Sequence, residues 1–326
     1  MTATPEAPRA GGIHPNSFHG PLPDVAADAG YVDHPPRKGF FTDTSVCIGC
    51  KACEVACKEW NEVPADGYQL SGMSYDNTQA LGAATWRHVA FVEKPLNPTT
   101  TDLGLPGMGP PGFEGYESGV QTAKPRPEDQ ATESGDGSIR WLMSSDVCKH
   151  CTHAACLDVC PTGSLFRTEF GTVVVQQDIC NGCGYCVPAC PYGVIDLSED
   201  DHKAHKCTLC YDRLKEDQTP ACAQACPTES IQFGDLDELR ERADARVAEL
   251  HEKGVDVARL YGHDPGDGVG GDGAFFLLLD EPEVYGLPPD PVVTTRDIAS
   301  IWKHVGAAAA TLAGLAAVSF LGGKRS

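Results

Sequence analysis

The chain has 326 residues, 41% of them hydrophobic, and a formal net charge of −21 at pH 7. That length allows two or three packed domains. Because so acidic a protein repels the phosphates of nucleic acid, no nucleic-acid partner is expected. The 35 glycines and 25 prolines favour a loop-rich fold, and 16 cysteines remain to be explained.

Residues 1–38 form a Pro/Gly-rich extension without the apolar segment of a signal peptide. The first cysteine quartet, CIGCKACEVAC, follows within residues 39–60. Residues 61–140 are predicted to be an insertion with one clear strand at 85–93, followed by a stretch rich in glycine and proline. The other three quartets lie within residues 141–233, and no cysteine lies outside the four quartets.

Three chemistries use cysteines at this density. Disulfides belong to oxidising compartments, and these sulfurs are too closely spaced to pair sensibly. Zinc is satisfied by two pairs of cysteines, a form that the fourth quartet has when taken alone. The third quartet is C-x2-C-x2-C-x3-C followed by proline, the signature of ferredoxins that hold two iron–sulfur clusters, and the second is a similar run that also ends in Cys-Pro. Iron–sulfur clusters are therefore the expected cofactor.

The segment between the second and third quartets predicts a strand, a turn at Gly171 and a second strand at 172–175. With its two quartets it makes an inner ferredoxin-like unit, residues 141–204. The first and fourth quartets, in 39–60 and 205–233, make an outer unit that is interrupted by everything between them. The expected fold class is α+β, with two ferredoxin-like two-cluster units, a loop-rich body and one C-terminal transmembrane helix.

In ferredoxin-type units the fourth cysteine of one quartet completes the cluster of the other quartet. The alternative is that each sequential quartet binds its own cluster. With the exchange, four ligand sets are expected, and these names are kept below: set 1 is Cys47, Cys50, Cys53 and Cys226; set 2 is Cys148, Cys151, Cys156 and Cys190; set 3 is Cys180, Cys183, Cys186 and Cys160; set 4 is Cys207, Cys210, Cys222 and Cys57.

Charged and polar residues beside the cysteines are also informative. Lys51, Lys149 and Lys206 adjoin cysteines and would offset the negative charge of thiolate-held clusters. His150 and His153, in the second cysteine loop, are expected at the surface. No nucleophile–base pair, phosphate loop or pair of catalytic carboxylates stands out, so no catalytic residue is predicted.

Residues 234–300 are predicted to hold a helix and a partner-contact segment. Apolar residues at helical spacing favour a helix from 236 to 250, with a capping box of Asp235 and Glu238 at its start and Gly254 at its end. The apolar run 274–279 is expected to be a strand or a contact for a partner protein.

The last segment, within 301–323, is expected to cross the membrane. Residues 305–323 carry no charge and have just the length that spans the hydrocarbon layer. The alternative is a buried, alanine-rich helix of a soluble domain. Trp302 before the segment and Arg325 after it suit a body outside the membrane and a cytoplasmic C-terminus.

Four stretches, 39–61, 148–196, 206–214 and 282–291, closely resemble the iron–sulfur β subunit of membrane-bound respiratory formate dehydrogenases, which are complex iron–sulfur molybdoenzymes. The resemblance covers most of residues 39–322. It implies a subunit that is not catalytic by itself and relays electrons through four [4Fe-4S] clusters. The donor would be a catalytic α subunit that oxidises formate at a molybdenum or tungsten bis-pterin centre, and the acceptor a haem b γ subunit that reduces quinone.

The resemblance further implies that set 1 faces the catalytic subunit, that set 3 faces the haem, and that the body lies on the outer face of the cell membrane. Other relays remain alternatives. Nitrate reductase β subunits have tryptophan in place of one cluster cysteine, and dimethyl sulfoxide reductase-type β subunits lack the terminal helix. A free polyferredoxin or a zinc-dependent scaffold would belong to a different class of protein.

Overall fold

The computed structural model describes residues 22, 24–67, 75–76, 78–95, 139–293, 295 and 298–322. Most of the predicted N-terminal extension and the Gly/Pro-rich stretch of the predicted insertion lie outside the described residues. The chain divides into two compact units, residues 92–142 and the remainder, and the remainder holds every cysteine. The domain boundaries given above stay predictions.

A four-stranded sheet organises the larger unit. Its order is β8-β1-β10-β9, with β1 at Lys38–Asp43, β8 at Ile231–Asp235, β9 at Arg259–Tyr261 and β10 at Ala274–Leu278. Strand β1 pairs in parallel with β10 and antiparallel with β8. The apolar run predicted at 274–279 is thus an inner strand of the sheet, and every residue of β10 is buried.

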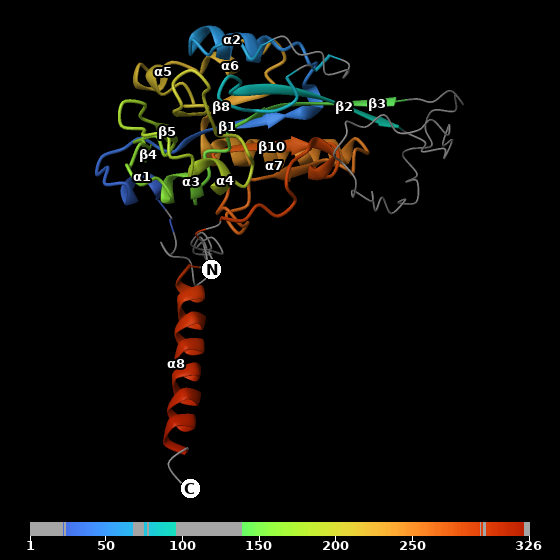
Figure 1. Cartoon of the computed structure of the whole chain (residues 1–326). Coiled ribbons are helices and arrows are strands. Elements are labelled where there is room, and N and C mark those ends of the chain that lie inside the picture. The colour runs from blue at the N-terminus through green and yellow to red at the C-terminus, as the bar shows by residue number, and fades with distance from the viewer. Residues whose placement is uncertain are drawn as a thin grey trace, which may run out of the picture. The chain divides into compact units, whose positions relative to one another are not determined.

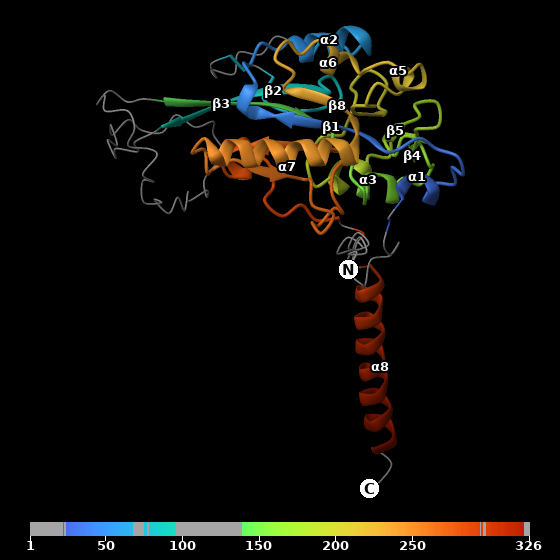
Figure 2. The same cartoon turned by 180° about the vertical axis from the view of Figure 1, so that it is seen from behind.

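Helix α7, Leu236–Glu252, covers one face of this sheet (Figures 1 and 2). Phe41 and Phe275 stack with ring centroids 5.3 Å apart and share an apolar cluster with the buried side of α7. Neighbouring strand residues point to opposite faces, so Phe40 lies in a second cluster together with several cysteines. The sheet therefore separates a purely apolar core from the cysteine-bearing half.

The predicted ends of α7 are partly confirmed. Gly254 has φ +82°, the left-handed conformation that commonly ends helices. The predicted capping box does not form in the expected way, because Asp235 occupies the N-cap position but its side chain makes no capping hydrogen bond. Its carboxylate pairs with Lys38 on the neighbouring strand instead.

Short helices carry or flank the cysteines. The helices of the first and fourth quartets pack together, as do those of the second and third. They are α2 (Ala52–Trp60) with α6 (Ala221–Gln224), and α3 (Ala155–Asp158) with α4 (Cys186–Ala189). Two more short helices, α5 (Tyr211–Lys215) and the 3₁₀ helix η1 (Thr44–Val46), adjoin cysteines, whereas α1 (Val25–Asp28) and the 3₁₀ helix η3 (Pro282–Tyr285) lie in segments without cysteines.

Three small two-stranded sheets accompany these helices. The hairpin of β4 (Leu165–Arg167) and β5 (Val173–Val175) turns at Gly171, φ +71°, as predicted. Strand β6 (Asp196–Leu197) pairs with β7 (Ala204–His205). Strand β2 (Arg87–Pro95) begins two residues after the predicted strand, and its partner β3 (Ile139–Val147) has no counterpart among the predicted elements.

Helix α8, Ile298–Gly322, ends the described chain. Its segment Ile301–Phe320 has a mean hydropathy of 1.3, and none of it is buried in the protein. Among the described residues it is the one helix long and apolar enough to cross a membrane. The exposure of side chains such as Leu315 and Phe320 disagrees with the alternative of a buried, alanine-rich helix. Residues 323–326 lie outside the described residues.

Candidate iron–sulfur centres

All sixteen cysteines are described, and none forms a disulfide. Within the described residues, no three His, Cys, Asp or Glu side chains converge closely enough to bind a single metal ion. Zinc needs such convergence, because its four ligands bind one ion at about 2.0–2.3 Å. The sulfurs that hold an iron–sulfur cube stand farther apart, since each binds a different iron.

The cysteines of set 1 line one cavity. Cys47, Cys50 and Cys53 come from the first quartet, and Cys226 comes from the fourth. Strands β1 and β8 bring them together, because β1 runs directly into the first cysteine loop and β8 follows the fourth. The backbone N–H of Asp43 donates to the carbonyl of Ser230 at 2.8 Å, which fixes this register.

The cysteines of set 2 line a second cavity together with Lys206. Cys148, Cys151 and Cys156 of the second quartet share it with Cys190 of the third. Packing of α3 against α4 joins the two quartets at this point. As in set 1, the fourth cysteine comes from the other quartet of the pair.

Sets 3 and 4 have the same exchanged composition. Asn61 directs its amide nitrogen to the sulfurs of both Cys57 and Cys210, at 3.7 and 3.9 Å, so cysteines of the first and fourth quartets are neighbours. Burial and then the nearby Cys183 and Cys160 raise the pKa of the Cys186 thiol to about 11. Cys160 thus lies beside the third quartet. The assignment of these residues as ligands stays a prediction.

One backbone feature recurs in all four cysteine loops. The residue just before the second cysteine is left-handed, with φ +65° at Gly49, +46° at His150, +70° at Gly182 and +56° at Leu209. This reversal curls the backbone around the cavity, so that cysteines before and after it face the same space. Glycine adopts the conformation freely, whereas at His150 and Leu209 it costs about 1–2 kcal/mol each.

Burial holds the two non-glycine residues in this conformation. Leu209 is fully buried, and His150 is 2% exposed, with its Nδ1 accepting a hydrogen bond from the backbone N–H of Val173 at 3.1 Å. The expectation of a surface position is therefore wrong for His150. Its ring is needed to close the inner hairpin onto the second cysteine loop, an arrangement that local sequence does not reveal.

The thiols themselves are poor metal ligands until they lose their protons. Burial, reinforced by Cys222, raises the pKa of Cys57 to about 12, and burial likewise raises the pKa of Cys156 to about 12 although Lys206 acts against it. Thiolates form here only if positive charge compensates them, whether from bound iron or from nearby cations.

The three lysines predicted to supply that charge differ. Lys51 pairs with Glu54, and Lys149 pairs with Asp146, so carboxylates already compensate both. Lys206 is 2% exposed and donates to the backbone carbonyls of Val173 and Cys207, and no carboxylate partner occurs among the described residues. Its charge is therefore available to the sulfurs of set 2.

Sequence reasoning missed Arg87, which lies on β2, thirty residues after Cys57. Its side chain is 1% exposed and lies over the ring of Phe40, and Nη1 donates to the carbonyl of Ser145 at 3.2 Å. In the described part of the chain, Nε and Nη2 have no hydrogen-bond partner and no carboxylate pairs with the guanidinium. Burial by itself lowers its pKa, but the sulfurs of Cys222 and Cys53 raise it above the usual value.

A buried cation without a counter-ion costs several kcal/mol. Arg87 is surrounded by sulfurs rather than carboxylates, so thiolates supply the missing negative charge only when they are ionised. Metal-bound clusters keep thiolates ionised, and the site therefore fits an anionic iron–sulfur group better than it fits free thiols.

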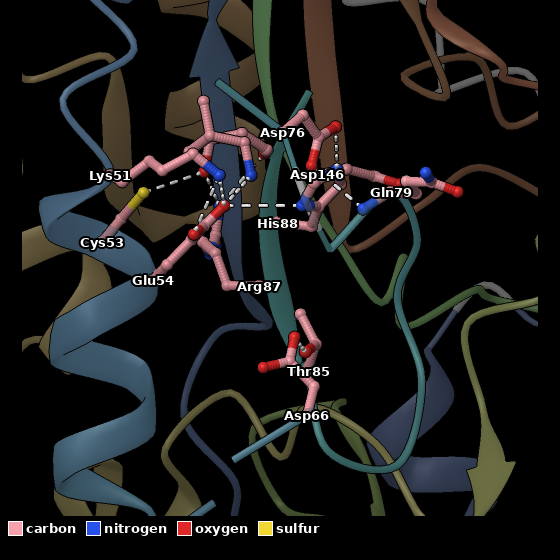
Figure 3. A network of polar contacts seen from close by, with 12 residues as sticks. Lys51, Cys53, Glu54, Asp66, Asp76, Gln79, Thr85, Arg87, His88 and Asp146 are labelled. Atoms are coloured by element: carbon pink, nitrogen blue, oxygen red, sulfur yellow. Dashed lines mark hydrogen bonds and ion pairs between the residues drawn. The ribbon is translucent and has the colours of Figure 1, made fainter. Parts of the chain in front are cut away.

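A polar network beside set 1 holds α2 against β2 (Figure 3). Glu54 accepts hydrogen bonds from Lys51, at 3.2 Å, and from the backbone of Val89, and lies 3.4 Å from Nδ1 of His88. Nε2 of His88 lies 3.1 Å from Asp76. Because Cys53 precedes Glu54 on α2 and Arg87 precedes His88 on β2, this network fixes the cysteine and the arginine relative to each other.

Comparisons with known proteins agree with the cysteine chemistry. Two models of 4Fe-4S dicluster domains match, at residues 139–236 and 46–164. The iron-sulfur subunit of the nitrate-inducible formate dehydrogenase of Escherichia coli is 35% identical over 275 residues, 83% of this chain and 78% of that protein. The formate dehydrogenase iron-sulfur subunit of Haemophilus influenzae is 36% identical over 87% of this chain and 79% of its own length. A component of the anaerobic dimethyl sulfoxide reductase of Escherichia coli is 31% identical over 63% of this chain and 76% of its own length.

The left-handed position gives a direct test of the cysteine loops. A Cβ at Gly182 would lie 2.3 Å from the backbone oxygen of His202, whereas a Cβ at Gly193, also left-handed, would meet nothing within 4 Å. Gly182→Ala should therefore distort the third cysteine loop and lose about a quarter of the bound iron, while Gly193→Ala should keep its iron at a cost of about 1–2 kcal/mol in stability. Iron analysis and thermal melting measure both effects, and equal iron in the two variants would contradict the role of this turn.

Proposed function

The chain belongs to the family of iron–sulfur subunits of formate dehydrogenase, and we propose that it carries electrons from a formate-oxidising subunit to a quinone-reducing membrane subunit. Like its relatives, it is an electron-transfer subunit and is not catalytic by itself. The observation that carries the proposal is the arrangement of the four cysteine sets. Each set has a neighbouring set close enough for a sulfur of one to influence the pKa of a group in or beside the other.

Each set would hold one [4Fe-4S] cluster, four in all. When bound, such a cluster accepts and releases one electron at a time. The chain supplies thiolates, buries them and offsets their charge. Two dicluster domain matches are consistent with four clusters. The cavities of sets 1 and 2, each lined by three cysteines of one quartet and the last cysteine of another, support the exchanged pairing over four sequential quartets.

Electrostatic neighbours support the order set 1, set 4, set 2, set 3. Burial lowers the pKa of Arg87, but the sulfurs of Cys222, in set 4, and Cys53, in set 1, both raise it. Burial raises the pKa of the Cys207 thiol, in set 4, and Cys148, in set 2, adds to that effect. Burial likewise raises the pKa of Cys156, in set 2, and Cys186, in set 3, makes a smaller contribution in the same direction. Electrons would therefore enter and leave at sets 1 and 3.

The two terminal sets are also the accessible ones. Cys50 of set 1 and Cys183 of set 3 are exposed, whereas no cysteine of sets 2 and 4 is. Exposed apolar side chains surround both, among them Ile48 (59% exposed) in the first loop and Tyr185 (61%) in the third. Such surfaces suit partner subunits. We assign set 1 to a catalytic subunit with a molybdenum or tungsten bis-pterin centre, and set 3 to a haem b subunit.

Helix α8 would anchor the chain in the membrane, with the body on the outer face and the C-terminus in the cytoplasm. Its length and exposed apolar surface support the anchor. The similarity to a component of dimethyl sulfoxide reductase keeps one second candidate, a relay in another molybdoenzyme of the same family. The longer match to the formate dehydrogenase subunits favours the first.

Purification of the full chain from its native membranes, with the bound partners identified by mass, tests this function. We expect a large catalytic subunit and a haem b subunit, and formate-dependent reduction of a dye by the complex. Reduction of dimethyl sulfoxide or nitrate without formate activity would favour the second candidate instead. Recovery of the chain without either partner would contradict the proposal.

Cysteine variants test the pairing. The intact chain should hold about sixteen irons and sixteen sulfides, four of each per cluster. Cys57→Ala and Cys207→Ala should each lose the same cluster signal in electron paramagnetic resonance, whereas Cys47→Ala should lose a different one. If Cys57→Ala and Cys47→Ala remove the same signal, each quartet binds its own cluster and the exchange is wrong.

Deletion of residues 301–326 tests the anchor. Because α8 makes the apolar surface that would lie in lipid, the truncated chain should appear in the soluble fraction with its iron content unchanged. Formate oxidation should then no longer reduce quinone. A truncated chain that remains membrane-bound in cells that do not make the partner subunits would contradict the role of α8.

A further inference from the structure

Arg87 occupies a place between two cysteine sets. The guanidinium lies 4.9 Å from the ring of Phe40, in the buried cluster that holds Cys53 of set 1 and Cys207 and Cys222 of set 4. Its Nη1 donates to the hydroxyl of Ser145 at 3.1 Å, and that hydroxyl lies 3.2 Å from the sulfur of Cys53. Burial lowers the pKa of Arg87, but the sulfurs of Cys222, Cys53, Cys207 and Cys57, three of them in set 4, raise it above the usual value. A single fixed cation thus faces both sets, and it faces set 4 with more sulfurs.

Other charges do not cancel this cation. The nearest acidic side chain along α2, Glu54, is held by Lys51 and His88, and Arg87 makes no ion pair within the described residues. Water does not reach the guanidinium, because the side chain is 1% exposed. In so dry a position a charge acts on its neighbours far more strongly than it does at the surface. Arginine also stays protonated at every pH the protein meets.

We propose that Arg87 is a positioning residue for electron transfer, a fixed cation that raises the reduction potential of the cluster held by set 4 and, to a smaller extent, of the cluster held by set 1. The inference rests on the proposed function, since it needs clusters in both sets. One electron added at set 4 brings one unit of negative charge and no proton. Arg87 faces that added charge and stabilises it.

Lys206 makes a matched comparison. Its charge neighbours are Cys148 and Cys156 of set 2 and Cys207 of set 4. It is buried and, among the described residues, lacks a carboxylate partner, as Arg87 does. The two cations therefore flank set 4 from the sides of set 1 and set 2. Loss of Lys206 should lower the reduction potentials of the clusters in sets 2 and 4, whereas loss of Arg87 should lower those in sets 4 and 1. Set 4 should therefore respond to both changes.

The test is a redox titration of the full chain, followed by electron paramagnetic resonance. Arg87→Gln should shift the equilibrium between reduced and oxidised cluster at set 4 about tenfold or more toward oxidised, about 59 mV for a one-electron couple. A second cluster should shift less, and two should not move. Lys206→Gln should shift set 2 most, and in the double variant the shifts at set 4 should add.

Two further variants separate charge from shape. Arg87→Lys keeps the positive charge and should leave the potentials close to those of the original chain. Arg259→Gln removes a cation that pairs with Glu281 at the surface and should change none of them. Unchanged potentials in Arg87→Gln, or equal shifts in Arg87→Lys and Arg87→Gln, would overturn the proposal.

Iron and sulfide analysis accompanies every titration. If Arg87→Gln keeps all its clusters and their reduction potentials are unchanged, the role of Arg87 is wrong, but the proposed function is not affected. An original chain without clusters defeats the proposed function instead. If both Arg87 variants lose iron, the guanidinium is needed for its shape in folding, and that result also overturns a role through charge.

Discussion

The burial of negative charge is the constraint on which the rest of this structure depends. Thiolates in a dry interior are costly unless positive charge lies among them, and fourteen of the sixteen cysteines are buried or partly buried. The chain is acidic overall, with a net charge of −21, yet Arg87 and Lys206 are nearly inaccessible and lie beside cysteines. Cations are thus placed inside, while the excess of carboxylates is left largely to the surface. The same separation makes the core compatible with anionic clusters.

The four-stranded sheet solves the problem of joining quartets that are far apart in the sequence. Strand β1 enters the first cysteine loop and β8 leaves the fourth, and their antiparallel register brings Cys226 to the cavity of Cys47. The other neighbour of β1 is β10, a strand from a further part of the chain, and β10 in turn pairs with β9. Without this sheet, the outer unit would be two separate loops.

Local patterns predicted the parts of the structure that depend on neighbouring residues. The cysteine spacing indicated the cofactor, apolar spacing indicated α7 and the hairpin at Gly171, and the uncharged run near the C-terminus indicated α8. The parallel pairing of β1 with β10 could not be predicted, because it depends on residues more than 200 positions apart. Arg87 was missed for the same reason: nothing in its immediate sequence links it to cysteines that only the folded chain brings near. The left-handed turns fall between these cases, since glycine marks two of them and burial alone explains the other two.

The proposed order of the cysteine sets gives a reason why the four loops are not equivalent. A set at either end of that order would meet a partner subunit, which suits a loop with an exposed cysteine and exposed apolar side chains, as at Cys50 and Cys183. An inner set has no partner to meet and can be buried, and set 4 is buried almost completely. Burial without compensation would make an added electron hardest to accept at set 4, because desolvation disfavours the more negative state. Arg87 faces this same set, and Lys206 flanks it from the other side. Compensating charge is thus greatest where burial is greatest. This keeps the inner sets from becoming a barrier to electron transfer between set 1 and set 3.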